Sequence, residues 1–257
     1  MEMPGALDNE DYFYYAHAAL PSNAALRNYS FCLDKTRYCA LWVAYPLHAC
    51  YLGEADRTDK FGYDPDVPTA WQANIGSNAY YPQGGASYSH ARGHQLPSAD
   101  RTATEADNAT TFYATNMTPQ LQTLNGGQWQ SLESKVRDWI CSDTLYVVTG
   151  AWFDPNRTPH YAYDTKGQGK ACPVPTHYWK VLLRSKSGNT GKPLRELPAS
   201  ELQSIGFWMD HDDKNSWNVA SSACSVREIE RHTGFTFFVN VPDAPKSTWD
   251  GTLWKGL

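Results

Sequence analysis

The sequence has no run of about 18 uninterrupted apolar residues, which excludes a membrane-spanning helix. It has no excess of positive charge either: 22 lysines and arginines stand against 27 aspartates and glutamates, and the formal net charge is −5. A protein coated in positive charge is therefore excluded, and any nucleic-acid binding must use a local basic patch. A zinc-protease HExxH sequence is also absent, because His90 precedes His94 by four residues without the glutamate between them.

The six cysteines include no CxxC pair, and their spacings do not match a zinc finger or ribbon. Their even number, with ten tryptophans and sixteen tyrosines, favours an oxidising compartment and disulfide bonds of unspecified pairing. The alternative is a set of buried free thiols in a cytosolic enzyme. Residues 1–10 are polar and acidic rather than charged and then apolar, so the expected secreted or periplasmic location requires a leader removed before this sequence.

The composition that remains is that of a folded protein with a sizeable core, since 41% of the 257 residues are hydrophobic and 14% aromatic. Residues 1–36 are turn-rich and polar and indicate an N-terminal arm, whereas residues 37–257 alternate strand and helix patterns without a linker or repeat. Apolar runs predict strands at 39–47, 145–150 and 178–183. Together these patterns predict one α+β domain.

The clearest helix follows Asn125, and a second one begins after Ser225. Apolar residues recur at three- and four-residue intervals in the first, which places them on one face: Trp129, Leu132, Val136, Trp139 and Ile140. Ser225 can cap the second helix, and Glu228 three residues later can complete a capping box.

A dense polar cluster spans residues 92–101 and begins with Arg92, Gly93 and His94. Histidine has an unperturbed pKa of about 6.5, which suits proton abstraction near neutral pH. Arginine is the best planar donor to phosphate oxygens. A base beside phosphate-binding arginines is what phosphodiester hydrolysis needs, although Arg-Gly-His alone occurs by chance and would more often be a surface or structural feature.

Further motifs follow this cluster in a fixed order, and the series resembles the DNA/RNA non-specific endonucleases of the ββα-metal (His-Me finger) superfamily. The matching segments after Arg92–His94 are Thr115–Gln120, Leu124–Trp129, Leu132–Glu133 and Arg137, with weaker likeness from Tyr38 to Val241. The resemblance implies an α+β fold with a mixed or antiparallel sheet core and flanking helices. It also implies that residues 37–257 are the endonuclease domain.

The resemblance assigns a role to each matching residue. His94 matches the general base that takes a proton from the attacking water, and Asn125 matches the direct protein ligand of the catalytic metal. Glu133 matches a carboxylate that orients water on the metal. The remaining candidates match arginines near the phosphate and an asparagine that supports the site: Arg57, Arg92, Arg137 and Asn116.

The chemistry of these residue types agrees with those roles. An amide oxygen and water suit Mg²⁺, with Mn²⁺ or another divalent cation as alternatives. Glu133 and Arg137 are one helical turn apart, and Asn125 lies two turns earlier, so one helix could present all three; alone, Glu133 and Arg137 would more simply form a solvated ion pair. Ala91 stands where many family members have aspartate. That change puts in doubt the hydrogen bonding that the aspartate supplies.

The sequence thus predicts a metal-dependent endonuclease that binds DNA and RNA through the phosphate backbone and acts as a monomer or homodimer. Two alternatives are a secreted, aromatic-rich carbohydrate-binding module and a nuclease homologue that binds nucleic acid without turnover. Outside the motif series, His211 lies among aspartates at 210, 212 and 213, a pattern typical of a solvated acidic loop, with a cation site as the alternative.

Overall fold

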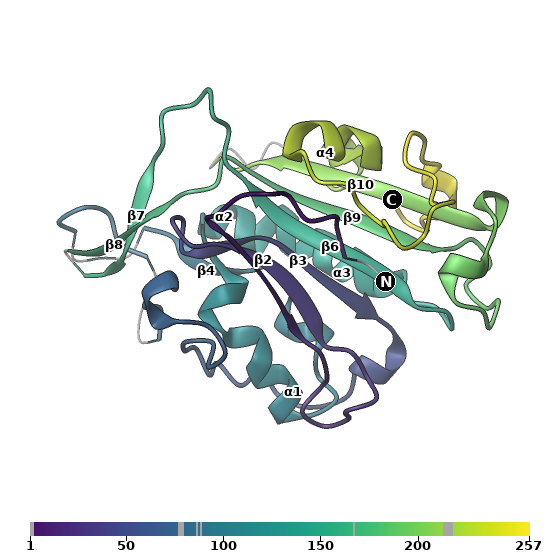
Figure 1. Cartoon of the computed structure of the whole chain (residues 1–257), viewed down its shortest axis with the longest axis horizontal. Coiled ribbons are helices and arrows are strands. Elements are labelled where there is room, and N and C mark those ends of the chain that lie inside the picture. The colour runs from purple at the N-terminus through teal and green to yellow at the C-terminus, as the bar shows by residue number, and fades with distance from the viewer. Residues whose placement is uncertain (1–2, 77–79, 86, 88, 167, 213–217) are drawn as a thin grey trace.

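The computed structural model describes residues 3–76, 80–85, 87, 89–166, 168–212 and 218–257. Its centre is an antiparallel sheet of seven strands (Figure 1). In spatial order the strands are β1 (Tyr12–His17), β2 (Tyr29–Asp34), β3 (Cys39–Leu47), β6 (Leu145–Trp152), β9 (His177–Ser185), β10 (Leu202–Asp210) and β11 (Ala223–Cys224).

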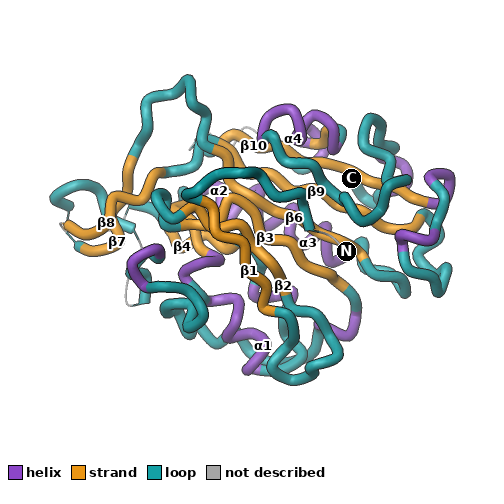
Figure 2. Tube along the Cα trace, in the orientation of Figure 1, coloured by secondary structure: helices purple, strands orange, loops and turns teal. Residues whose placement is uncertain are grey.

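Two strand pairs stand apart from this sheet, and the α-helices are few and short (Figure 2). The pairs are β4 (Ala91–His94) with β5 (Met117–Gln120), and β7 (Tyr161–Thr165) with β8 (Gln168–Pro173). The α-helices are α1 (Glu105–Ala109), α2 (Gln122–Leu124), α3 (Gln130–Asp138) and α4 (Val226–Thr233). Among the described residues no helix has the length and apolar content needed to cross a membrane.

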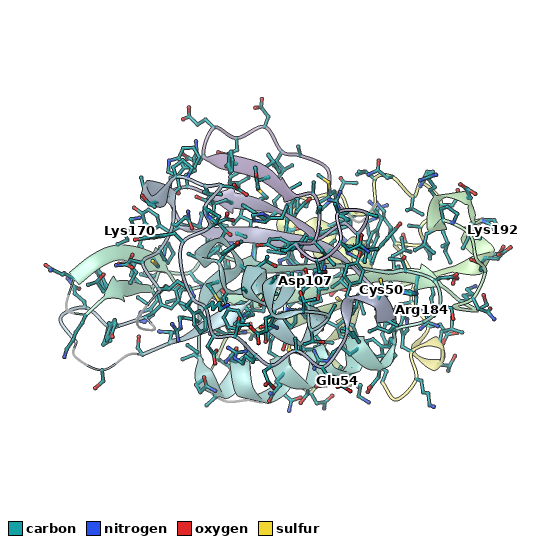
Figure 3. All side chains as sticks on the ribbon, turned by 90° about the horizontal axis from the view of Figure 1, so that it is seen from below. Cys50, Glu54, Asp107, Lys170, Arg184 and Lys192 are labelled. Atoms are coloured by element: carbon teal, nitrogen blue, oxygen red, sulfur yellow. The ribbon has the colours of Figure 1, made fainter. Side chains whose placement is uncertain are left out.

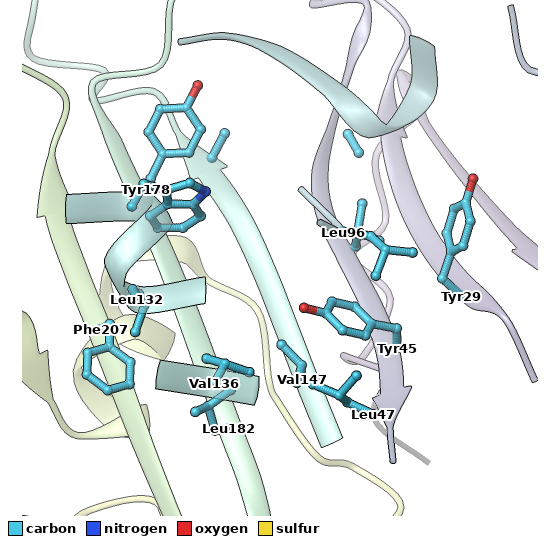
Figure 4. Packing of buried hydrophobic residues seen from close by; sticks show 14 of the residues in the cluster. Tyr29, Tyr45, Leu47, Leu96, Leu132, Val136, Val147, Tyr178, Leu182 and Phe207 are labelled. Atoms are coloured by element: carbon cyan, nitrogen blue, oxygen red, sulfur yellow. The ribbon is translucent and has the colours of Figure 1, made fainter. Parts of the chain in front are cut away.

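The sheet carries an apolar core on each face, because side chains alternate along its strands. On one face Leu132 and Val136 of α3 pack with Leu182 and Phe207 of the sheet (Figure 4). On the other face α4 supplies Val226 and Ile229, which pack with apolar side chains from the alternate positions of β3, β6 and β9. A fully buried side chain of this size contributes about 1.5–3 kcal/mol, so the two cores hold both helices in fixed positions.

The prediction for the N-terminal residues differs from the structure, which places β1 and β2 in the main sheet rather than in a polar, turn-rich arm. The two strands pair in register from Tyr12 opposite Asp34 to His17 opposite Tyr29, and every residue of β2 is buried. The aromatic side chains of β1 pack on the core at its edge. Polar neighbours and turns in residues 18–28 hid these two short strands from a reading of the sequence alone.

The predicted strands are confirmed within β3, β6 and β9, and the predicted amphipathic helix is confirmed in α3. Its expected start at Asn125 is wrong in detail. Residues 125–129 form a wide turn in which Gly127 has φ −113° and ψ −116°, outside the helical region. Asn125 therefore lies before a kink, and α3 proper begins at Gln130.

The expected disulfide bonds are not found: all six cysteines, each of which lies in the described part of the chain, are free. Four of them are buried in the core, namely Cys32, Cys39, Cys172 and Cys224, as the free-thiol alternative anticipates. Cys50 lies at the surface, where Figure 3 labels it among charged side chains.

Candidate active site

One surface cavity of about 340 Å³ brings together nearly all of the residues that the motifs single out. The predicted site residues that line it are Arg57, Arg92, His94, Asn125, Glu133 and Arg137. Its other lining residues are Pro97, Ser98, Ala99, Gln122, Gly126 and Gln130. Three arginines and one glutamate line the cavity, so the acidic chain carries the local basic patch that nucleic-acid binding requires.

The β4–β5 hairpin positions His94, which pairs with Met117 at the end of β4. Gly93, beside it, lies directly under the side chain of Gln120. A Cβ atom at position 93 would stand 2.4 Å from Oε1 and 2.6 Å from Cβ of Gln120. The glycine of the Arg-Gly-His motif is therefore needed for close packing of the two strands, which fixes the backbone on which His94 sits.

The His94 ring is held by aromatic neighbours and by the backbone. Phe61 and Phe112 meet it edge-on, with ring centroids 6.0 and 5.0 Å away. Burial, together with the charges of Arg57 and Arg92, lowers the pKa of His94 to about 3, and a hydrogen bond to the Arg92 backbone opposes the shift. Nε2 is buried and has no hydrogen-bond partner among the described residues. The ring is therefore neutral near pH 7 and keeps one unpartnered nitrogen whose lone pair can accept a proton, while the neighbouring arginine charges weaken its basicity.

Arg92 is aligned by an aromatic ring and a neutral oxygen, which leaves its charge available to a ligand, whereas Arg57 also forms an exposed ion pair. The guanidinium carbon of Arg92 lies 3.3 Å from the Phe61 ring centroid, and Nη1 donates to the carbonyl of Ile75 at 3.0 Å. Arg57 donates to Ser98 Oγ at 3.0 Å, and its Nε pairs with the exposed carboxylate of Asp59 at 2.7 Å. Arg57 lines this cavity, as expected of an arginine near the phosphate.

Arg137 is anchored by a buried carboxylate that the sequence analysis left without a role. Arg137 Nη1 lies 3.1 Å from Oδ1 of Asp100, and Tyr45 donates its hydroxyl to Oδ2 of the same carboxylate at 2.9 Å. Asp100 is 1% exposed. Its position six residues after His94 was visible in the sequence, but its link to Tyr45 depends on the folded sheet.

Asn116 is absent from the cavity lining and lies in the protein interior, 0% exposed. Its Oδ1 accepts from the Leu96 amide at 2.8 Å, while Nδ2 donates to the carbonyls of Leu96 and Thr111 at 2.9 and 2.7 Å. Asn116 therefore does not line the cavity itself. Its bonds instead hold the chain two residues beyond His94, which agrees with the supporting role that the resemblance implies.

Asn125 and Glu133 offer the oxygen atoms that a hard divalent cation prefers. The only side-chain bond of Asn125 is a long one from Nδ2 to Gln122 Oε1 at 3.4 Å, so among the described residues its carbonyl oxygen is left without a partner. Burial raises the pKa of Glu133 to about 7, while Lys180, Arg137 and Arg57 act to lower it. The donor set of these two side chains in an open cavity fits a cation that keeps most of its waters.

Lys180 is a buried cation near Glu133 that the sequence analysis missed. It is 0% exposed, its Nζ donates to Thr149 Oγ1 at 2.9 Å, and it lies 4.3 Å from the Trp129 ring centroid. Burial lowers the pKa of Lys180 to about 8, against the opposing influence of Glu133 and Asp100. A lysine within the apolar run of β9 was the available signal, because a buried charge in a strand needs a partner.

A second group of potential cation ligands, His17, Asp64 and Asp66, lies outside the cavity lining. The His17 ring nitrogens lie 2.9 Å from Asp64 and 3.5 Å from Asp66. Asp64 also accepts the Thr115 hydroxyl at 2.8 Å. These bonds tie β1 to the segment between β3 and β4 that carries Asp64 and Asp66, and they account for the cluster without a metal.

Comparison with known proteins agrees with this arrangement of residues. A model of the DNA/RNA non-specific endonuclease family matches residues 10–244. The chain belongs to this family. A nuclease from Nostoc sp. is 33% identical over 215 residues, which cover 83% of this chain and 72% of the relative. The mitochondrial nuclease EXOG of Danio rerio is 31% identical over 221 residues, which cover 82% of this chain and 59% of that relative.

A solved structure, that of the EndoG/EndoGI complex, shares the fold with a TM-score of 0.64 at 22% identity, and the match covers 86% of this chain and 90% of the other. The predicted α+β ββα-metal nuclease fold is thereby confirmed. In this family member the ββα unit comprises β4, β5 and the α2–α3 segment. It carries His94 on its first strand and Asn125 and Glu133 on its helical part.

Proposed function

We propose that this protein is a metal-dependent endonuclease that hydrolyses DNA and RNA with little sequence preference. Family membership makes it a phosphodiester hydrolase. The observation that carries the finer proposal is the free Nε2 of His94, which shares one cavity with three arginines, Asn125 and Glu133. Everything that attack on a phosphodiester requires from protein side chains lies around that cavity.

In the proposed reaction His94 Nε2 accepts a proton from the attacking water, which becomes nucleophilic as it approaches phosphorus. Arg57 and Arg92 bind the non-bridging phosphate oxygens, whose negative charge grows in the transition state. Arg137, fixed by Asp100, places a third guanidinium in the lining of the same cavity. Burial keeps His94 neutral near pH 7, so Nε2 carries a lone pair for the proton.

Asn125 would bind a divalent cation such as Mg²⁺ through its carbonyl oxygen, and Glu133 would accept hydrogen bonds from the waters around it. When bound, such a cation supplies positive charge that stabilises the leaving oxygen. Because recognition would rest on phosphates and sugars, it would carry little sequence information, and binding would weaken steeply as salt rises.

Ala91 does not favour the alternative of a homologue without turnover. Ala91 lies on β4, pairs with Gln120 of β5, and is not among the residues that line the cavity. The carbohydrate-binding alternative needs exposed tryptophans, yet five of the ten are fully buried: Trp42, Trp129, Trp139, Trp179 and Trp254. Trp249 is the one tryptophan among the exposed large hydrophobic side chains of the described residues.

The test is nicking of plasmid DNA and degradation of RNA with Mg²⁺ and with EDTA. We expect both activities in Mg²⁺, none in EDTA, and a loss of about 10²- to 10⁴-fold in His94→Ala, the range for removal of a general base. His48→Ala is the matched control, because His48 is only half-buried and lies outside the cavity lining. Near wild-type nicking by His94→Ala would overturn the mechanism, and cutting in EDTA would overturn the metal requirement.

A further inference from the structure

A second cavity, of about 450 Å³, lies beside the proposed catalytic one. His90 lines it, two residues before Arg92 of the catalytic cavity, and Leu121 lines it next to Gln122. Residues two apart in an extended chain point to the same side, about 7 Å from each other. The chain around β4 therefore contributes side chains to both cavities, from positions about 7 Å apart.

Three imidazole rings surround this second cavity. His90 comes from the start of the β4 segment, His160 from the chain just before β7, which projects from the sheet at the left of Figure 1, and His211 from the chain just after β10. The ring centroid of His90 lies 6.0 Å from that of His160 and 6.1 Å from that of His211. Burial lowers the pKa of His90 and of His211 to about 4, so both rings are neutral at pH 7.

The ring nitrogens of His211 are already engaged, which argues against a metal. Its Nδ1 lies 2.7 Å from the carbonyl of Pro175, and its Nε2 accepts from the Leu121 amide at 2.7 Å. The solvated acidic loop expected around His211 is thus wrong for the histidine itself, which is held by backbone groups; Asp213 lies outside the described residues. Asp210 bonds instead to His177 at 2.7 Å.

The cavity offers little free charge to a phosphate. Arg157 at its rim pairs with Asp154 at 3.6 Å and with Asp210 at 3.4 Å. The rest of the lining combines the neutral imidazoles of His90 and His211, the ring of His160 and small polar groups with the apolar side chains of Leu121, Val174 and Pro175. Flat neutral rings and apolar walls favour stacking against an uncharged heteroaromatic ring.

We propose that the cavity bounded by His90, His160 and His211 binds one nucleobase of the substrate strand, adjacent to the bond that is cut. This subsite rests on the proposed nuclease function and extends it. A base can enter the cavity only after leaving its stack and its pairing partner, which costs a few kcal/mol in a duplex and little in a single strand. The subsite therefore makes unpaired strands the better substrates, without reading sequence.

The test uses an end-labelled single-stranded DNA with one abasic nucleotide in the middle, cut in Mg²⁺ to partial digestion. We expect wild-type cleavage at one bond flanking the abasic position to fall about tenfold below the other bonds of the strand, the scale of one lost base–aromatic stack. In His160→Ala the same bond should be cut nearly as well as its neighbours. The ratio is taken within each lane, so overall activity does not affect it.

His160→Ala is the first variant because this side chain is exposed. His90→Ala is the second, and His48→Ala is the control that should keep the wild-type pattern. The subsite proposal is overturned if cleavage beside the abasic position is reduced equally in wild type and in both variants, or if it is not reduced in wild type. Neither result would affect the nuclease activity itself. Failure of the proposed function shows itself differently, as no metal-dependent cutting at any bond of the intact strand.

Discussion

Glu133 differs from the other charged residues of the catalytic cavity because its protonation is balanced near neutral pH. Burial raises its pKa to about 7 despite three positive charges nearby, from Lys180, Arg137 and Arg57. When it is ionised, a carboxyl group in this position is an acceptor at both oxygens, whereas the protonated form carries an O–H donor and no charge. Its proposed role with Asn125 thus depends on the surrounding cations as much as on the carboxylate itself.

We expect Glu133→Gln to lower metal-dependent turnover about 10- to 100-fold, the usual cost of removing an outer partner of a metal site. The amide has nearly the same shape but carries no charge, so the concentration of Mg²⁺ needed for half-maximal activity should rise as well. A Mg²⁺ titration of initial rates measures both effects. Glu54→Gln, an exposed carboxylate outside the cavity, is the control. An unchanged Mg²⁺ requirement would contradict the role given to Glu133.

The residue types of the cavity could be predicted because the motifs carry them in order, from Arg92 through Arg137. What could not be predicted were the contacts between distant segments. Asp100 holds Arg137 and Lys180 lies close to Glu133 only after the sheet and α3 have packed together. The sequence also did not show that Asn116 is fully buried and bonds to Leu96, two residues beyond His94.

At the scale of elements, the β4–β5 hairpin depends on one glycine. The side chain of Gln120 crosses Gly93 so closely that an added methyl group would lie 2.6 Å from Gln120 Cβ, an atom that cannot move without the strand. We expect Gly93→Ala to lower the free energy of unfolding by about 1–3 kcal/mol, the usual cost of overpacking, and to reduce activity by displacing His94. Urea unfolding and nicking rates measure the two effects.

Gly62→Ala is the matched control for Gly93→Ala. No atom lies within 4 Å of a Cβ atom placed at residue 62, and that glycine has no positive φ. The stability of the Gly62→Ala variant should stay near that of wild type, although Gly62 forms a bridge to Tyr113, close to the β4–β5 pair. Equal stability of the two alanine variants would show that the hairpin can open without cost, against the reason given for the motif glycine.

Elements with a clear periodicity of apolar residues could be predicted from the sequence, whereas the short strands β1 and β2 could not. The helix at α3 and the strands β6 and β9 follow from apolar spacing, since each buries a continuous apolar face. The strands β1 and β2 mix aromatic with polar side chains, and they become regular only through pairing of β1 with β2 and of β2 with β3. The kink at Gly127 likewise reflects how the turn joins two short helices, which no local pattern encodes.

At the scale of the whole molecule, buried neutral histidines make the fold sensitive to acid. Burial lowers the pKa of His94 to about 3 and those of His90 and His211 to about 4, from an ordinary value of 6.5. Above pH 6.5 these rings are neutral in both the folded and the unfolded chain and do not affect stability. As the pH falls from 6.5 toward 4 the unfolded chain binds protons that the folded chain does not, so stability is lost.

Each unit of pKa difference corresponds to about 1.4 kcal/mol, so three histidines together can remove several kcal/mol, a large share of the roughly 5–15 kcal/mol typical of a folded domain. We expect the free energy of unfolding in urea to fall between pH 6.5 and pH 4. The fall should be shallower in His90→Gln, which removes one of the rings, and as steep as in wild type in His48→Gln, a control that lines neither cavity. A flat profile over this range would mean that these rings take up protons in the folded state, and therefore that water reaches the cavities that they line.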